Sequence, residues 1–414
     1  SSLETFDEAV GDALRQSISL LLNDNQLTQA TFSVKQGGIG LRSAVATSDA
    51  AYLGSRGVTH ARCQALREGH SWDISLDSYL ALAANRCNSI MSSAGMLHRI
   101  DLTHTLYQKN ISKHINVARV LIWDQKAVPD DACNRRAYAA PLAGKILGVV
   151  PSKTLDKYLT RLEFVTDVAL RLGVDVFEPG TSCPFCGDII DARGRHALSC
   201  MCGGDATLVH NIVRDITHDY CQRGVLRPER EATGLLRGLS LTDGRRRPAD
   251  VLVCSSNCLV RRTPDGARIL GRKVALDFAV INAVGATHWR STFDNPGGAE
   301  LAYSERKCNH LNTATKCLDV GLVFQPMVIS AQGGMTSQMG AVLHGIAAAV
   351  ATAEGTDVDA VRLDMFERIS IAVVRANSRA VVRRRGRLSH KLGAASIHRF
   401  VAAASALLED PPGA

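Results

Sequence analysis

The spacing of apolar residues predicts a helical first part of the chain and a second part in which strands alternate with helices. Residues 6–22, 79–96 and 155–172 carry apolar side chains at helical spacing, so the region up to about residue 180 is predicted to be mostly helix. A glycine cluster in residues 35–42 interrupts this region and predicts a turn between two helices. No Lys-Ser or Lys-Thr pair opens the next helix, as a phosphate-binding loop requires, so we interpret the glycines as structural.

After the helical pattern of residues 205–223 the apolar residues change their period. Short runs rich in β-branched residues predict buried strands at 250–254, 273–281 and 321–329. A Pro-Asp-Gly sequence in residues 263–266 predicts a turn between the first two strands. Helical patterns occupy residues 205–223, 299–318, 336–353 and 358–382. This alternation predicts one α/β domain within a chain whose overall fold class is α+β.

The patterns divide the 414 residues into four segments, a length that suits about two to three domains. They are a helical region (1–180), a small cysteine-rich segment (181–204), the α/β domain (205–353) and a C-terminal helical basic tail (354–414). Apolar residues make up 46% of the chain, and no apolar run approaches the roughly 18 to 20 residues that span a bilayer. Because the start lacks both an initiating Met and a signal peptide, we expect an intracellular fragment of a larger protein.

The net charge of +8 adds a candidate binding property, since the basic residues gather in short runs. Such runs suit the phosphate backbone of nucleic acid, whereas the alternative for any one run is a solvated surface. Arg261 and Arg262 form one short basic run, and Arg387 belongs to the run that begins at Arg383. The residues we predict to contact nucleic acid are Arg245, Arg246, Arg247, Arg383, Arg384 and Arg385.

The cysteine-rich segment has the spacing of a zinc site. Cys183, Cys186, His196 and Cys200 follow the pattern C-x2-C-x9-H-x3-C. Two short-spaced pairs separated by a small loop can close a tetrahedral site, and four protein ligands leave no position for water, so we predict a structural Zn²⁺. Cys202 and His210 are spare candidates that could replace one of these ligands. The alternative is a set of ordinary buried thiols with a surface histidine.

Two aspartates of the predicted strands are candidates for a second metal site. Asp250 opens one strand and Asp277 lies within the next, and neighbouring strands are about 5 Å apart, so their carboxylates can converge on one hard cation such as Mg²⁺. Nucleases that hydrolyse phosphodiesters use such carboxylates together with a lysine. The alternative is that both aspartates are turn or edge residues.

The lysine departs from the usual pattern of P-D, a spacer and then D/E-x-K. Phe278 and Ala279 follow Asp277, so no lysine stands two positions after the second acid. Lys307, on the predicted helix after the strand, is the best substitute. Lys273 is the second choice, because it precedes Asp277 by four residues on the same face of the same strand.

These motifs resemble the part of non-long-terminal-repeat retrotransposon proteins that follows the reverse transcriptase, in the class with a restriction-like endonuclease. The likeness is strongest from about residue 180, and a weaker one is carried upstream by Val34-Lys-Gln-Gly-Gly-Ile-Gly-Leu-Arg42. The motifs that carry it are Gly194-Arg-His-Ala-Leu-Ser-Cys200, Gly203-Gly204-Asp205, His210-Asn211-Ile-Val-Arg214-Asp215, Arg247-Pro-Ala-Asp250-Val-Leu-Val, Ala275-Leu-Asp277-Phe, Ala302-Tyr-Ser-Glu305-Arg-Lys307 and Glu367-Arg-Ile-Ser-Ile-Ala-Val-Val-Arg375-Ala-Asn377.

The resemblance implies a function for each segment. Residues 1–180 correspond to the post-polymerase segment, residues 181–204 to a CCHC zinc knuckle and residues 205–353 to a PD-(D/E)xK restriction-endonuclease-like domain. The implied activity is Mg²⁺-dependent nicking of target DNA, which primes reverse transcription, so the implied partners are target DNA, element RNA and the rest of the polyprotein, in the nucleus. Asp250 and Asp277 are the implied Mg²⁺ ligands, Lys307 the displaced lysine and Glu305 an additional ligand or helper.

Polymerase activity is not carried over. The only adjacent aspartates, Asp130 and Asp131, follow Val128-Pro129 and lack the aromatic residue of a Tyr-x-Asp-Asp signature. A catalytically decayed module that only binds nucleic acid is the alternative reading of the whole chain, because copies of mobile elements often lose activity.

Overall fold

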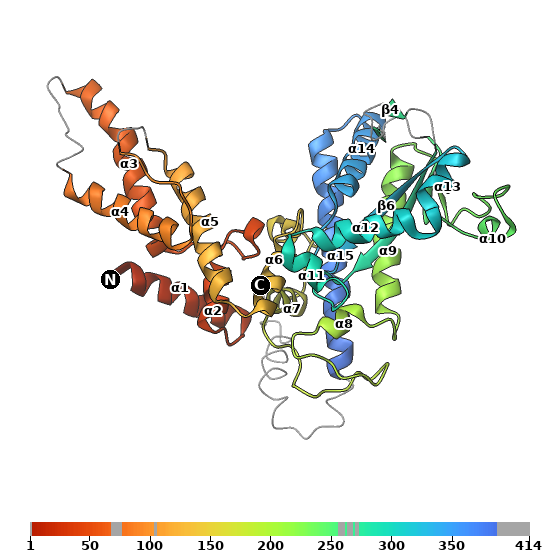
Figure 1. The fold of residues 1–414 in the computed structure, drawn as a ribbon, viewed down its shortest axis with the longest axis horizontal. Coiled ribbons are helices and arrows are strands. Elements are labelled where there is room, and N and C mark those ends of the chain that lie inside the picture. Colours follow the sequence, from red (N-terminus) through yellow and green to blue (C-terminus); the bar gives the residue numbers. More distant parts are fainter. Residues whose placement is uncertain are drawn as a thin grey trace. The chain divides into compact units, whose positions relative to one another are not determined.

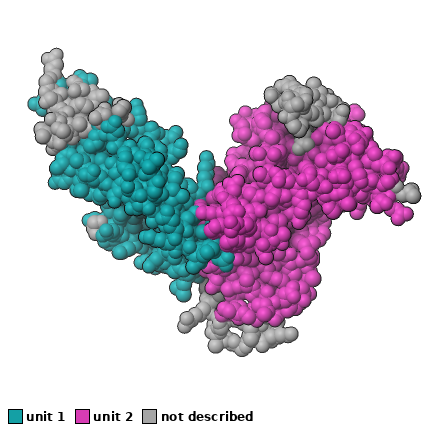
Figure 2. Space-filling view, in the orientation of Figure 1, with its two compact units in different colours: residues 1–132 teal, residues 133–414 magenta. Residues whose placement is uncertain are grey.

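The computed structural model describes residues 2–67, 77–102, 106–255, 261–262, 268–269 and 273–386. The chain forms two compact units, residues 1–132 and residues 133–414, which are teal and magenta in Figure 2. The last part of the predicted helical region, residues 133–180, therefore belongs to the second unit. Within the described residues, no helix has the length and apolar character needed to cross a membrane.

The first unit is helical throughout its described residues. Its core lies between three helices, where Leu53, Leu80 and Ile115 are buried together. The predicted helices at 6–22 and 79–96 are confirmed, although each starts and ends slightly earlier than expected. The elements are α1 (Ser2–Ile18), α2 (Asp24–Ala30), the 3-10 helix η1 (Val34–Gln36), α3 (Ala44–Leu66), α4 (Ser78–Ser93) and α5 (Gln108–Lys126).

The glycine cluster after α2 forms a tight turn around η1. Gly37 and Gly40 have φ angles of 84° and 82°, in the left-handed region that glycine adopts without a steric cost. A Cβ atom on Gly38 would lie 2.1 Å from the carbonyl oxygen of Phe32. The backbone packing therefore requires glycine here, as the structural interpretation of this cluster expects.

The second unit contains the sheet and the remaining helices (Figure 1). The helix α6 (Pro129–Tyr138) begins in the last residues of the first unit and continues into the second. The other helical elements of the second unit are η3 (Lys145–Gly148), α7 (Arg161–Arg171), α8 (Arg195–Ser199), α9 (Asp205–Arg223), α10 (Leu241–Gly244), α11 (Trp289–Asp294), α12 (Gly298–Asn309), η4 (His310–Asn312), α13 (Thr313–Asp319), α14 (Ser337–Glu354) and α15 (Val358–Gly386). Its strands are β1 (Pro228–Arg230), β2 (Val251–Val253), β3 (Arg261–Arg262), β4 (Arg268–Ile269), β5 (Lys273–Ile281) and β6 (Leu322–Ser330).

The main sheet is mixed and has the strand order β1-β2-β5-β6. β1 pairs antiparallel with β2, β2 pairs antiparallel with β5, and β5 pairs parallel with β6. The parallel pair requires a crossover connection, which α11, α12 and α13 supply between β5 and β6. β3 and β4 form a separate antiparallel pair, and the predicted turn at 263–266 lies outside the described residues.

Helices cover both faces of this sheet. Because alternate strand residues point to opposite faces, the two sets of side chains on β5 pack against different helices. On one face, Leu276 and Phe278 of β5 are buried in one cluster with residues of α9, α14 and α15. On the other face, Ala275 of β5 packs with Cys317 of α13, and Ala279 packs with Ala299 of α12. Asp277 shares the face of Ala275 and Ala279, so its side chain lies on the side of α12.

The C-terminal helix α15 is part of the core and does not form the separate basic tail expected for residues 354–414. Its Met365, Ile369 and Val373 are buried in the cluster that contains Leu276. The sequence prediction separated this helix from the α/β domain because its basic end resembled a solvated tail. Residues 387–414 lie outside the described residues.

Other predicted elements match the structure to different degrees. α9 and β5 have the predicted bounds. The helix predicted at 155–172 begins only at Arg161, because Thr160 caps its N-terminus through a capping box with Glu163. The helix predicted at 299–318 is broken into α12 and α13, since Leu311 and Asn312 adopt left-handed φ angles of 51° and 53°.

Candidate functional site

Four side chains of the cysteine-rich segment converge at one point. The ligand atoms of Cys183, Cys186, His196 and Cys200 all lie within 4.8 Å of one another. Zn²⁺ binds cysteine sulfur at about 2.3 Å and histidine nitrogen at about 2.0 Å in a tetrahedron, so a set this close fits the ion after small shifts. The cluster can therefore hold a metal ion such as zinc.

The backbone around the cluster explains how the short spacing closes. The amide of Cys183 donates to the carbonyl of Asp188, and Ser182 pairs with Ile189, which folds the first two cysteines into a tight turn. The carboxylate of Asp191 accepts from the amides of Arg195 and His196 at the start of α8. Burial raises the pKa of the Cys183 thiol, but amide donors at Phe185 and Cys186 outweigh it and lower that pKa to about 6. A lowered thiol pKa favours the thiolate that metals bind.

Neither spare candidate belongs to this cluster. The side chain of Cys202 is exposed, and its backbone carbonyl accepts a hydrogen bond from the guanidinium of Arg384. His210 lies on α9, where its imidazole faces Asp250. Of the described residues, only the four predicted ligands form a group of three or more that could hold a metal ion.

The arginines at the end of α15 contact the cysteine-rich segment. Arg384 is fully buried, and its guanidinium donates to the carboxylate of Asp205 at 2.9 Å. Arg383 donates to the same carboxylate at 2.7 Å, and both guanidinium groups lie over the ring of Phe185. Arg385 is largely enclosed and donates to the carbonyl of Val176.

These contacts bear on the predicted role of Arg383, Arg384 and Arg385 as nucleic-acid contacts. All three guanidinium groups have internal partners that join α15 to residues 176–205, and Arg384 is fully buried, so it does not face solvent. Arg383 and Arg385 are only partly buried, and their contact with nucleic acid stays a prediction. The sequence pattern missed this because a run of arginines looks alike whether its partners are internal or external.

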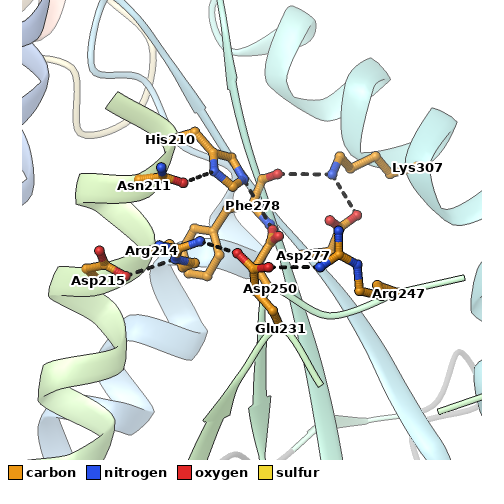
Figure 3. Close-up of polar contacts among 10 residues, drawn as sticks. All are labelled: His210, Asn211, Arg214, Asp215, Glu231, Arg247, Asp250, Asp277, Phe278 and Lys307. Atoms are coloured by element: carbon orange, nitrogen blue, oxygen red, sulfur yellow. Dashed lines mark hydrogen bonds and ion pairs between the residues drawn. The ribbon is translucent and has the colours of Figure 1, made fainter. Parts of the chain in front are cut away.

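Asp250 directly precedes β2 and lies beside Asp277 of β5 (Figure 3). Its backbone amide donates to the carbonyl of Leu276 at 2.9 Å, and its Oδ2 accepts from the amide of Phe278 at 2.7 Å. These two contacts lie on either side of Asp277 along the strand. The pairing of β2 with β5 thus brings the two predicted carboxylates to adjacent strands, as the sequence analysis expected.

Lys307 reaches Asp277 from α12. Its Nζ atom lies 2.6 Å from Oδ2 of Asp277 and 3.1 Å from the carbonyl oxygen of Phe278. The second choice, Lys273, is exposed at the first position of β5, and neither of these contacts involves it. The structure therefore brings the predicted substitute lysine to the second aspartate.

The two aspartates differ in their ionisation. Burial raises the pKa of Asp277 above its usual value, against the opposing charge of Lys307. Burial also disfavours the charged form of Asp250, but the hydrogen bonds from His210 and from the amide of Phe278 lower its pKa overall. Two neighbouring carboxylates with pKa values displaced in opposite directions are typical of a functional site.

Glu305 lies outside this group. It is exposed on α12, two residues from Lys307, and residues at this spacing point to different sides of a helix. Because no described contact joins Glu305 to Asp250, Asp277 or Lys307, its role as a further ligand or helper stays a prediction. His210 takes part instead, since its Nε2 atom lies 3.3 Å from Oδ2 of Asp250. The sequence motif His210-Asn211 contains this residue, but the only role predicted for His210 was that of a spare zinc ligand.

A basic pocket of about 630 Å³ opens beside Asp277 and Lys307. Arg246 and Arg247, two of the arginines predicted to bind nucleic acid, line it, and Arg245 is exposed nearby in sequence. The sequence pattern did not assign the other lining residues to a binding surface, because they come from separate parts of the chain: the segment before β2, α12 and the residues after it, and β6. The remaining lining residues are Pro248, Tyr303, Arg306, His310, Thr313 and Phe324.

Glu231 fixes the rim of this pocket. Its Oε2 accepts from Arg247 at 2.9 Å, while its Oε1 accepts from Arg214 of α9 at 2.7 Å (Figure 3). The side chain of Arg247 nevertheless remains 58% exposed, so it can also contact a phosphate in solvent. Arg246 is more enclosed, because it donates to Asp243 and to Thr313.

The chain matches no family model and no curated protein sequence. The assignment of a function to this site therefore depends on its geometry and chemistry, together with the resemblance of its motifs.

Proposed function

We propose that the chain is a Mg²⁺-dependent DNA endonuclease whose site is formed by Asp250, Asp277 and Lys307. The observation that carries the proposal is the placement of Asp250 beside β5, next to Asp277, whose carboxylate binds Lys307 at the edge of a basic pocket. This combination suits the hydrolysis of a phosphodiester, because the substrate is an anion and its reaction develops further negative charge. A mixed sheet with helices on both faces is compatible with a restriction-like fold.

The carboxylates suit Mg²⁺ by their chemistry. Mg²⁺ prefers oxygen ligands and is commonly held by one or two carboxylates, with water and substrate phosphate completing its shell. Asp250 and Asp277 would hold it, since the described contacts engage only the Oδ2 atom of each carboxylate. When bound, the ion supplies Lewis-acid chemistry and an activated water.

The other side chains act directly on the substrate. Lys307 places a positive charge at the carboxylate pair, where it can neutralise charge that develops on the phosphate. Arg247 and Arg306 bind the flanking phosphates from the pocket lining. The four-ligand cluster takes a structural Zn²⁺, because its four protein ligands leave no open position for a reacting water.

The resemblance to retrotransposon proteins indicates the biological process in which this endonuclease would act. The nicked DNA strand would prime reverse transcription of element RNA by a polymerase encoded elsewhere in the polyprotein, at the integration site in the nucleus. The PD-(D/E)xK assignment, with its displaced lysine, belongs to the same proposal.

A supercoiled-plasmid assay tests the activity. The wild-type chain with Mg²⁺ should convert supercoiled DNA to the nicked form, and chelation with EDTA should stop it. Asp250→Ala and Asp277→Ala should each abolish nicking, whereas Asp359→Ala, a largely exposed residue at the start of α15, should retain it. Nicking that survives the double replacement of Asp250 and Asp277 would refute the assignment.

A second candidate function is nucleic-acid binding without cleavage. It is favoured by the small number of candidate ligands: among the described residues, Asp250 and Asp277 belong to no group of three or more side chains that could hold a metal ion, and Lys307 already binds the carboxylate of Asp277. The distinguishing result is retained, salt-dependent DNA binding by a folded, zinc-loaded chain that shows no cleavage with either Mg²⁺ or Mn²⁺.

A further inference from the structure

His210 contacts the candidate metal ligand Asp250 although the proposed reaction gives it no role. It lies on α9, in the segment that begins at Asp205, and its half-buried imidazole points toward the start of β2 (Figure 3). Its Nε2 atom lies 3.3 Å from Oδ2 of Asp250, across 40 residues of sequence. This contact therefore depends on the packing of α9 against the sheet.

The hydrogen bonds of Asp250 are divided unequally between its two oxygens. Oδ2 accepts from the amide of Phe278 at 2.7 Å and faces Nε2 of His210. No described residue forms a hydrogen bond with Oδ1. Two donors on one oxygen fix the rotation of the carboxylate and leave the other oxygen available as a ligand.

The second ring nitrogen of His210 is also engaged. Nδ1 lies 3.3 Å from Oδ1 of Asn211, which accepts hydrogen bonds. With an acceptor at each nitrogen, the ring can donate in both directions, and only the doubly protonated form satisfies both at once. The hydrogen bond with Asp250 accordingly raises the pKa of His210. Asp277 and Arg214 are the other charged groups that interact electrostatically with the imidazole of His210.

We propose that His210 is a positioning residue for Asp250, which it holds through Oδ2 so that Oδ1 is available to a divalent cation. This inference rests on the proposed function, since it assigns Asp250 as a cation ligand. His210 itself does not contact the cation or the substrate. It resembles the outer partners of metal-binding carboxylates, whose loss weakens metal affinity while the ligand itself remains.

Direct titration with Mn²⁺ tests this role without reference to cleavage. Calorimetry on the zinc-loaded full chain should show that His210→Ala weakens Mn²⁺ binding by about 10- to 100-fold, the usual cost of losing an outer partner. His210→Gln retains an N–H donor at the end of a side chain of similar reach, so it should recover most of the affinity. His344→Ala, an exposed histidine on α14, is the matched control and should leave Mn²⁺ binding unchanged. Unfolding by urea shows whether each variant remains folded.

The outcomes separate the two proposals. If the wild type binds Mn²⁺ and cleaves DNA, but folded His210→Ala binds Mn²⁺ equally well, the positioning role fails and the nuclease stands. Equal loss of affinity in His210→Gln and His210→Ala would also refute the positioning role, because the donor would then be irrelevant. If Asp250→Asn binds Mn²⁺ as tightly as the wild type, the cation site itself is wrong and both proposals fall.

Discussion

Arg384 of α15 donates to the carboxylate of Asp205, the first residue of α9, across 179 residues of sequence. Arg384 is completely buried, and only 5% of the Asp205 side chain is exposed. The same guanidinium donates to the carbonyl of Cys202, next to the four-ligand cluster. A single buried ion pair therefore ties the C-terminal helix to both the candidate zinc site and the helix that carries His210.

Removing one partner of this pair should destabilise the fold strongly. Arg384→Met removes the buried donor to Oδ2 of Asp205 and leaves this carboxylate with the more exposed Arg383, a change that should cost up to about 3–5 kcal/mol. Urea unfolding should show this loss. Arg362→Ala, which breaks the solvent-exposed pair with Asp359, is the control and should cost about 0–1 kcal/mol. A loss for Arg384→Met no larger than that of the control would show that the pair is dispensable.

The candidate zinc site should hold one equivalent of metal. Cys183→Ser and Cys186→Ser should each lose this metal and destabilise the segment, because structural zinc binding is coupled to folding. Cys202→Ser provides the matched control, since this cysteine is exposed and outside the cluster. Metal analysis of the purified variants measures the result. One equivalent of metal retained in the Cys183/Cys186 double variant would move the site to other ligands.

Lys307 and Lys273 should differ in their effect on nicking. Lys307→Ala should slow the single-turnover rate by about 100- to 1000-fold, the usual cost of one preorganised group that stabilises developing charge. Lys273→Ala should leave the rate unchanged, because this lysine is exposed at the start of β5. The rates are measured on supercoiled plasmid with saturating Mg²⁺. If the two variants exchange these effects, the strand lysine is the functional one.

The pocket arginines should account for part of the salt dependence of DNA binding. Arg247→Ala and Arg306→Ala should each reduce the slope of log affinity against log salt by about 1, as expected for one lost phosphate contact. Arg290→Ala is the control, because it is exposed on α11 and paired with Asp294. Fluorescence anisotropy at several salt concentrations measures the slope. Slopes that change with Arg290 but not with Arg247 or Arg306 would place the interface elsewhere.

The pair of His210 and Asp250 should give the metal-free chain a defined pH dependence of stability. The pKa of His210 is raised by its hydrogen bond to Asp250, so its contribution is fully present below the unfolded value of about 6.5 and is lost as the pH rises through the folded value. The pKa of Asp250 is lowered, although burial opposes this, so its contribution is present above about 3.9 and is lost as the pH falls through its folded value.

The difference in unfolding free energy between the wild type and His210→Gln should therefore be largest near pH 5 to 6 and decrease toward pH 9. Urea titrations across this range measure it, with His344→Ala as the control. A difference that grows with pH would contradict the charge assignment of this pair.

The sequence by itself determined the parts of the protein that depend on local pattern. The bounds of α9 and β5 follow from helical and strand spacing, because one apolar face of each must be buried. The four ligands of the candidate zinc site lie within 18 residues of one another, from Cys183 to Cys200, so their short-range spacing is enough to predict their convergence. The two aspartates were predictable for a similar reason, since each lies at or next to a recognisable strand.

Only the tertiary structure decided which distant side chains join these local features. The sequence ranked Lys307 above Lys273, but the contact of Lys307 with Asp277 depends on the position of α12 beside β5. The break in the helix at Leu311 and Asn312 has no periodic signal in the sequence. His210 joined Asp250 instead of the zinc cluster because α9 packs against the sheet. The arginines at the end of α15 have internal partners, because Asp205 and Phe185 contact their guanidinium groups in the folded chain. Such contacts join residues tens to hundreds of positions apart, and residue type alone does not specify the partner of a charged side chain.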